Sequence, residues 1–309
     1  MADIIVREGA EALTVVRKRY WGRWLLALFC FVVLAAAIHS VLTAPGFMWN
    51  VFADQLFSPV VLRGLWCTVY LTVLSMVFGI VLGIVAALMR QSRNPIVAMV
   101  AAGYIWVFRG TPVLVQVIIW YNLAALYPEL SFGIPGLDPI VSVSANAAIT
   151  PLTAALLGLG LNEGAYMAEI VRAGLLSVDP GQREAAHALG MTQLHTLRRI
   201  VLPQALRIIV PPTGNEAISM LKATSLVSIV AIPELLYAVQ GIYSRTFQTI
   251  PLLLVACFWY LGATTVLSYG QGLIERRLGR GHIESRDDGL ARLRHWVFGY
   301  LARRRTVSC

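Results

Sequence analysis

The sequence predicts an all-α polytopic membrane protein, and three observations lead to this fold class. Of the 309 residues, 58% are hydrophobic and 13% are charged, which is too little polar surface for a globular protein in water. Apolar segments of about 20 residues or more recur along the chain, and each is long enough to cross the hydrocarbon core as a helix. Arginine and lysine concentrate in every second connection. The net charge of +9 is therefore a topology signal and not a sign of nucleic-acid binding.

Six spans are expected, at residues 24–42, 60–89, 96–127, 149–171, 206–232 and 252–273. The basic connections precede the first span, follow the second, fourth and sixth, and predict that both termini are cytoplasmic. The chain divides accordingly into a basic N-terminus (1–23), a first transmembrane helix (24–44), a transmembrane domain (60–275) and a basic cytoplasmic tail (276–309).

The two terminal segments leave alternatives open. The first span also resembles a secretory signal, although the lack of a clean Ala-x-Ala cleavage site favours a retained helix. The tail has an apolar stripe that fits anionic-lipid contact, and a solvated, partly disordered tail is the alternative. The stripe consists of Leu290, Leu293, Trp296, Val297 and Leu301.

Local signals modify two of the internal spans. Residues 96–127 would extend about 48 Å as one straight helix, and Gly110-Thr111-Pro112 predicts a distortion within it. In the second span, Gly79 and Gly83 have the Gly-x-x-x-Gly spacing that permits close helix packing.

Several kinds of chemistry are absent from the sequence. A phosphate-binding P-loop needs a lysine between glycine and serine or threonine, but the two lysines, Lys18 and Lys222, lie in other contexts. The histidines lack the spacing of a zinc site, and the four cysteines are widely separated. We therefore expect no enzyme activity and no cofactor bound by this chain.

The connection after the fourth span has its own helix signals. Asp179 can cap a helix with Pro180 at its first position and Gln182 in a capping box, and Gly190 can end it in the left-handed conformation. Thr192 can cap a second helix over residues 193–200, and Pro203 is expected to stop it. The pair fits either interfacial helices on lipid headgroups or a docking element with a small-residue face formed by Ala185, Ala186 and Gly190.

The same segment carries a recognisable motif. Glu184-Ala185-Ala186, then Gly190, Ile200 and Leu202-Pro203, resembles the EAA signature of permease subunits of ATP-binding-cassette importers. Flanking segments resemble the polar amino-acid uptake branch of that family, covering about residues 60–273. They are RGTPVLVQ at 109–116, AYMAEIVR at 165–172 and KATSL at 222–226.

This resemblance implies the permease subunit of a type I importer in the bacterial inner membrane, with a five-helix core and one extra N-terminal transmembrane helix. The implied partners are a second permease subunit, identical or homologous, a periplasmic amino-acid-binding protein and a pair of cytoplasmic ATPases that bind ATP and Mg. Glu184 and Gly190 are the expected centre of the ATPase contact. Ala185 and Ala186 pack beside them, and Ile200, Leu202 and Pro203 complete the coupling set.

Polar residues inside the spans are candidates for the substrate pathway, because an ionisable group in the bilayer usually faces a partner or an aqueous cavity. Arg109 or Lys222 can bind the carboxylate of a polar amino acid, and Glu163 or Glu216 its ammonium group, with Asn215 beside Glu216. Other roles stay open: Arg109 can extend to the interface, and Lys222 can bind carbonyls at a helix end.

Further details separate these candidates. The offset of six residues places Glu216 and Lys222 on different faces of one helix. We expect Glu169 and Arg172, three positions apart, to form a surface ion pair.

Two other functions compete with the importer. A secondary transporter or channel working without an ATPase predicts inverted repeats, which the sequence does not display, and leaves the EAA spacing unexplained. An ATPase-partnered channel or signalling receptor with the same membrane fold is the second alternative.

Overall fold

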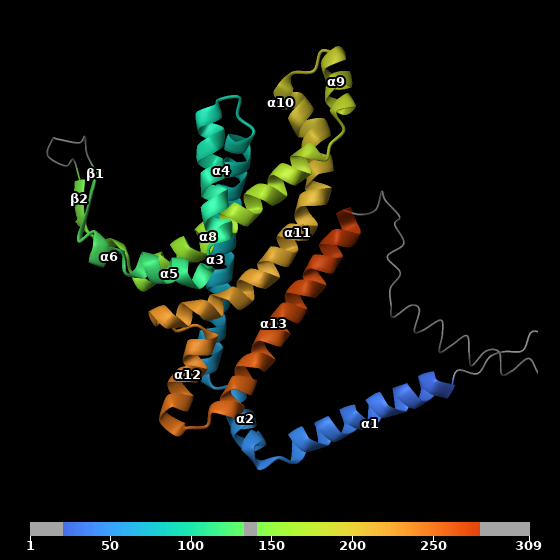
Figure 1. Ribbon diagram of the computed structural model, residues 1–309, viewed down its shortest axis with the longest axis vertical. Helices are drawn as coiled ribbons and strands as arrows, with labels where there is room; N and C mark the ends of the chain where they lie inside the picture. The colour runs from blue at the N-terminus through green and yellow to red at the C-terminus, as the bar shows by residue number, and fades with distance from the viewer. Residues whose placement is uncertain (1–20, 133–140, 279–309) are drawn as a thin grey trace, which may run out of the picture.

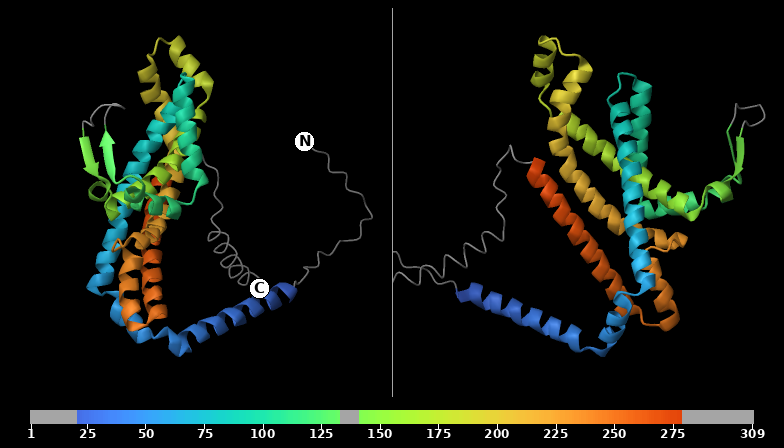
Figure 2. Two further views of the ribbon diagram at one scale, coloured as in Figure 1. Left: turned by 60° about the vertical axis from the view of Figure 1, so that its left-hand side comes forward. Right: turned by 180° about the vertical axis from the view of Figure 1, so that it is seen from behind.

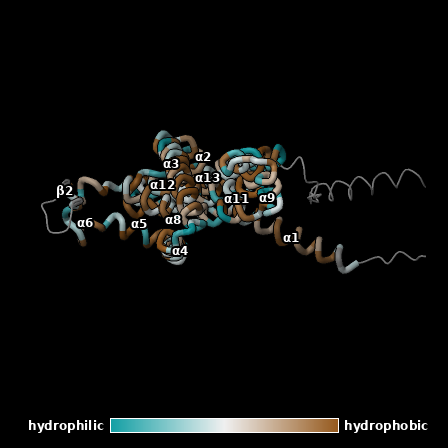
Figure 3. The backbone as a smooth tube through the Cα atoms, turned by 90° about the horizontal axis from the view of Figure 1, so that it is seen from above, coloured by the Kyte–Doolittle hydropathy of each residue, from teal (hydrophilic) through white to brown (hydrophobic). Residues whose placement is uncertain are grey.

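The computed structural model describes residues 21–132 and 141–278, and helices dominate it (Figure 1). The bundle consists of α3 (Pro59–Arg90), α8 (Pro151–Leu176), α11 (Leu202–Ala223) and α13 (Thr249–Leu278), with α4 (Pro95–Gly110) beside α3 and α8. Hydrophobic residues predominate along these helices (Figure 3). The all-α class is confirmed.

The packing of α3 against α8 forms the centre of the bundle. Glycines on α3 allow it: a Cβ on Gly79 would lie 2.5 Å from Cγ of Glu163, and a Cβ on Gly83 would collide with Met167. Gly164 on α8 makes the reciprocal approach, because its Cβ would lie 2.9 Å from Cβ of Leu82. The predicted role of the Gly-x-x-x-Gly pair in close packing is confirmed.

Three described helices are long and apolar enough to cross a membrane: residues 24–43 of α1 (Trp21–Thr43), α3 and α13. The number is five if each of two bent helix pairs is one span. The predicted fourth span, α8, is not among them because polar residues such as Asn162 and Glu163 lower its hydropathy. A helix at the centre of a bundle contacts protein more than lipid, so it needs less apolar character. The count of six spans stays a prediction.

The third span is broken, as Gly110-Thr111-Pro112 predicts. Helix α4 ends at Gly110, and α5 (Val113–Tyr121) continues at an angle of 104° to it, followed by α6 (Leu123–Leu126). The proline supplies no amide hydrogen and so interrupts the helical hydrogen bonds. We call residues 110–112 the membrane break.

Several connections contain structure that the sequence analysis did not assign. Residues 46–59 include the end of η1 (Pro45–Phe47) and all of α2 (Trp49–Leu56). Between α6 and α8 lie an antiparallel hairpin, β1 (Glu129–Phe132) and β2 (Val141–Ser144), and α7 (Ala145–Ala148). These elements are short, so their hydrophobic periodicity is too weak to distinguish them from loops.

The fifth span also continues beyond its predicted end. After α11 the chain forms η3 (Thr224–Val230), turns at Ala231 with φ 60°, and continues as α12 (Leu235–Thr246) at 47° to the preceding helix. Helix α12 packs on α3 and α13. The connection at residues 233–251 is therefore largely helical and partly buried.

Helix α1 leaves the bundle and is exposed along its described length (Figures 1 and 2). Its position matches the predicted extra N-terminal helix. Most of the basic N-terminus at residues 1–23, and the tail after residue 278 with its apolar stripe, lie outside the described residues.

The two ends of the bundle differ. The turn between α3 and α4 lies at the same end as α9 (Pro180–Ala188) and α10 (Gln193–Thr196), while α2 and the α12–α13 turn lie at the opposite end (Figures 1 and 2). Both internal basic connections therefore share one end, as expected from the charge pattern. The orientation relative to a membrane stays a prediction.

Candidate functional site

The first part of the candidate site is the segment at residues 179–203, which we call the coupling loop. Helix α9 begins after Asp179, whose Oδ1 accepts a hydrogen bond of 2.7 Å from the amide of Gly181. It ends at Gly190, which has φ +76°. The amides of Gly190 and Met191 donate to the carbonyls of His187 and Ala186, the pattern of a Schellman motif. The predicted cap and the predicted end are both confirmed.

The second helix differs from the prediction in its end. Helix α10 is capped by Thr192, whose Oγ1 accepts from the amide of His195, but Pro203 does not stop it. The helical path continues through a π-helical turn, η2 (Leu197–Val201), into α11. Proline is tolerated in the first turn of a helix, and the side-chain amide of Gln204 donates to the carbonyl of Ile200 at 3.0 Å. The second helix of the loop and the fifth span therefore form one continuous helical segment.

The coupling loop is tied firmly to the membrane helices. Arg183 Nη2 donates at 2.6 Å to the carbonyl of Leu175, near the end of α8. The buried cluster beneath the loop joins Val178 and Val201 to residues of α3, α8 and α11: Ala87, Met167, Val171, Ala205 and Ile209. The loop is thus packed on the ends of α8 and α11.

The motif residues divide into two groups. Ala186 is 1% exposed and packs within the chain, so it stabilises the loop itself. Glu184, Ala185 and Gly190 are exposed, as are Leu202 and Pro203, while Ile200 is half-buried.

Sequence reasoning missed two exposed leucines of the loop. Leu189, beside Gly190, is 83% exposed, and Leu194 on α10 is also exposed. Their signal was two large apolar residues in a polar loop. We call these two leucines and Gly190, all exposed on the loop, the loop tip.

The second part of the candidate site is a polar cluster of Arg109, Glu163, Tyr166 and Glu216, from α4, α8 and α11. The Arg109 guanidinium lies 5.0 Å from the centre of the Tyr166 ring, a cation–π contact. Glu216 is close enough to interact electrostatically with both Arg109 and Glu163. Glu163 is 4% exposed, and its Oε1 has no hydrogen-bond partner among the described residues. Three of the predicted pathway residues are thus linked by electrostatic interactions, Arg109 with Glu216 and Glu216 with Glu163.

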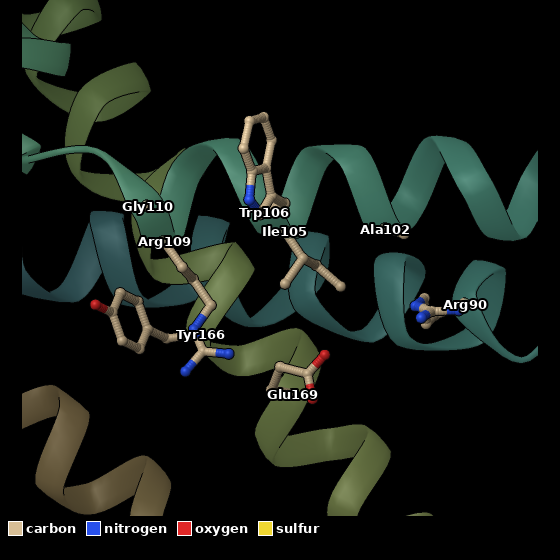
Figure 4. A pocket seen from close by; sticks show the side chains of 8 residues that line it. All are labelled: Arg90, Ala102, Ile105, Trp106, Arg109, Gly110, Tyr166 and Glu169. Atoms are coloured by element: carbon tan, nitrogen blue, oxygen red, sulfur yellow. The ribbon is translucent and has the colours of Figure 1, made fainter.

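A pocket of about 450 Å³ opens beside this cluster between α4 and α8 (Figure 4). Its lining consists of Arg90, Ala102, Ile105, Trp106, Arg109, Gly110, Tyr166 and Glu169. Glu169 is paired with Arg172 at 2.6 Å, which confirms the predicted helix-surface pair. The two arginines of the lining, Arg90 and Arg109, therefore give the pocket an excess of positive charge.

Two other candidates lie elsewhere. The Oδ1 of Asn215 accepts from Gln271 Nε2 of α13 at 3.0 Å, so Asn215 contacts α13, whereas Glu216 interacts with residues of α4 and α8. Lys222 lines a separate pocket of about 350 Å³ with Cys257 and Tyr260 of α13. The expected separation of Lys222 from Glu216 is confirmed.

The end of α4 at the membrane break is capped by two side-chain amides. Gln116 Nε2 lies 3.0 Å from the carbonyl of Phe108, 3.1 Å from the carbonyl of Thr111 and 2.8 Å from its Oγ1. Asn162 Nδ2 of α8 donates to the same Phe108 carbonyl at 2.6 Å. Gln116 and Asn162 stand out in the sequence as polar residues within spans, but their capping role was not predicted because both come from other helices.

A buried carboxylate that the sequence analysis missed stabilises α12. Glu234 is fully buried, and its oxygens accept from the amides of Leu236 and Tyr237 at 2.9 and 2.7 Å. It also accepts from the hydroxyl of Tyr260 at 2.7 Å, and Thr68 lies at 3.5 Å. The available signal was an acidic residue directly before the apolar Leu235-Leu236. This network joins α3, α12 and α13.

Comparisons with known proteins place these features in a family. Residues 79–280 match the family described as the binding-protein-dependent transport system inner membrane component. The arginine transport system permease protein ArgU of Corynebacterium glutamicum is 45% identical over 266 residues, covering 85% of this chain and 82% of that protein. The glutamine transport system permease protein GlnP of Escherichia coli is 35% identical over 221 residues, covering 71% of this chain and 93% of that protein.

A solved structure gives the same result. An amino acid ABC transporter, crystallised with histidines, matches with a TM-score of 0.61 and 36% identity, covering 73% of this chain and 97% of that one. The residues matched by the family, 79–280, include the coupling loop and most of the five-helix bundle. The chain belongs to the family of inner-membrane components of binding-protein-dependent transport systems, and its relatives are permease subunits of amino-acid importers.

Proposed function

We propose that this chain is the permease subunit of an ATP-driven importer in the inner membrane that carries cationic amino acids. The observation that carries the substrate class is the acidic pair Glu163 and Glu216, which interact electrostatically, together with Arg109, which interacts electrostatically with Glu216. A cationic amino acid has two positive groups and one negative group. Two acidic side chains and one guanidinium offer a hydrogen-bonding partner for each of these groups. The 45% identity to an arginine permease supports the same class.

The coupling loop supports an ATPase partner. Its exposed tip, Leu189, Gly190 and Leu194, offers an apolar surface next to Glu184, and a groove on a cytoplasmic protein can bind such a helix pair. ATP and Mg belong to that partner. Because the loop packs on α8 and α11, a movement of the loop displaces the two helices that carry Glu163, Tyr166 and Glu216. ATPase closure would thereby change access to the polar cluster.

The exposed position of Arg109 supports a second permease subunit. Arg109 is the fifteenth residue of α4, about 21 Å along the helix axis from its start, and its side chain is exposed. A cation at this depth is costly in lipid. We place it on an aqueous pathway between two permease subunits. The family description supports a binding protein as the source of substrate at the end opposite the coupling loop.

The test is uptake of labelled amino acids by proteoliposomes that hold the permease with its ATPase, supplied with excess binding protein. We expect uptake of a cationic amino acid, and a fall of about tenfold or more in its rate for Glu216→Gln, equivalent to about 1.4 kcal/mol. Glu129→Gln in the hairpin is the control. Uptake of neutral amino acids alone, or full activity of Glu216→Gln, would overturn the proposed substrate class.

A further inference from the structure

The membrane break raises the question of what its two amide side chains do for transport. Helix α4 ends at Gly110, partway along the predicted third span, so its last carbonyls need hydrogen-bond donors that the helix no longer provides. In the structure these donors are neutral: Thr111 Oγ1 donates to the carbonyl of Val107 at 2.8 Å, and Gln116 and Asn162 donate to that of Phe108.

A cation stands next to these carbonyls and does not bind them in the described contacts. Arg109 occupies the last turn of α4, where an arginine ordinarily hydrogen-bonds the final carbonyls and interacts with the negative end of the helix dipole. Its guanidinium instead lies over the Tyr166 ring, at 5.0 Å from the ring centre, and within electrostatic range of Glu216. The carbonyl that would attract it is already occupied by two amides.

Burial shows that Gln116 acts as a donor. Gln116 is 6% exposed, and its Oε1 has no hydrogen-bond partner among the described residues, whereas Nε2 lies near three acceptors. Two of these acceptors are backbone carbonyls, which cannot donate, so the atom that fixes the side chain is the donor nitrogen. Asn162 reaches the same carbonyl from α8, so the hydrogen bonds of the cap also depend on the position of α8 relative to α4.

We infer that Gln116 and Asn162 are positioning residues that keep the Arg109 guanidinium free to bind the carboxylate of the transported amino acid. This inference rests on the proposed function. Without the two amides, Arg109 would turn toward the carbonyls of Phe108 and Thr111, and the substrate carboxylate would lose its partner.

The experiment measures equilibrium binding of a labelled cationic amino acid to the purified permease–ATPase complex without binding protein. Gln116→Glu keeps the size of the side chain but replaces the donor with an oxygen. We expect about tenfold weaker binding for Gln116→Glu and a similar loss for Asn162→Asp. The matched control is Gln91→Glu, because Gln91 Nε2 also donates to a helix-end carbonyl, that of Ala87 at 3.3 Å, at the far end of α3.

Two further measurements separate positioning from a merely structural role. The decarboxylated analogue of the same amino acid should bind wild type and Gln116→Glu equally, since it has no carboxylate. In an Arg109→Ala background, Gln116→Glu should cause no further loss. Equal weakening of the analogue, or full additivity with Arg109→Ala, would overturn the inference. If Gln116→Glu does not assemble, Asn162→Asp is judged by the same two criteria.

The outcome for wild type tests the proposed function separately. If wild type binds a neutral amino acid in place of a cationic one, the proposed substrate class fails. The comparison with a decarboxylated analogue then uses that amino acid, because every amino acid carries the carboxylate on which the inference depends.

Discussion

The coupling loop and the membrane break both contain helix ends, but they stabilise them differently. In the loop, Asp179 and Gly190 satisfy the ends of α9 from within a few residues. At the break, the end of α4 depends on Gln116 and on Asn162, which is 54 positions away from Phe108. Local caps hold while the bundle rearranges, whereas the cap at the break requires α4, α5 and α8 to stay in place. The loop is therefore suited to transmit movement, and the break to respond to it.

The largest effect is expected at the tip of the loop. Gly190→Trp places a ring where the described structure has open space within 4 Å, so the chain should insert normally while the ring holds the ATPase away. We expect uptake to fall by more than about tenfold, which corresponds to at least about 1.4 kcal/mol. The measurement is copurification of the ATPase with the variant.

The control for this prediction is Gly190→Asn, since asparagine tolerates the left-handed conformation at φ +76°. It should retain the ATPase. Stoichiometric copurification of the ATPase with Gly190→Trp would contradict the docking role of the loop.

The next effect concerns the packing on which the break depends. Gly83→Leu on α3 collides with Met167 of α8, and overpacking of this kind costs about 3 kcal/mol. We expect a thermal midpoint several degrees lower for the purified complex. Gly103→Leu on α4 has open space and should leave the midpoint unchanged. Equal midpoints for the two variants would contradict the close approach of α3 and α8.

A smaller loss is expected for Glu234, which caps α12 locally and also binds distant residues of α13 and α3. Glu234→Ala leaves two amides of α12 and the hydroxyl of Tyr260 without their buried acceptor, at a cost of about 2 kcal/mol. Thermal unfolding measures the loss, and Glu129→Ala in the exposed hairpin is the control. An unchanged midpoint would show that solvent reaches Glu234.

The smallest effect tests the local caps. Asp179→Ala removes the acceptor for the amide of Gly181 and should destabilise α9 by about 1 kcal/mol. Hydrogen exchange should accelerate at the amides of α9 and remain unchanged in α4, and Asp179→Asn should preserve wild-type rates. Faster exchange in α4 would show that the two regions are not separately stabilised.

The same contrast explains what the sequence could predict. Asp179, Thr192 and Gly190 act on neighbouring residues, so their roles were readable from spacing. The prediction that Pro203 ends the second helix was wrong, because a proline in the first turn of α11 and the π-helical turn before it allow the helix to continue. No short sequence motif identifies the π-helical turn η2 that precedes Pro203.

The polar cluster was predictable in composition but not in geometry. Arg109, Glu163 and Glu216 stood out as ionisable groups within spans, yet their proximity depends on how three helices cross. Asn215, adjacent to Glu216 in sequence, instead contacts Gln271 of α13. The burial of Glu234 was overlooked because two of its four partners, Thr68 and Tyr260, lie in distant spans.

The most direct test of the account is uptake of a labelled cationic amino acid by proteoliposomes containing this permease, its binding protein and either the active ATPase or an ATPase that binds but does not hydrolyse ATP. The account predicts accumulation against a gradient with the active ATPase and none with the inactive one. Equal uptake in both would show that the chain transports without an ATPase, and would contradict the role assigned to the coupling loop.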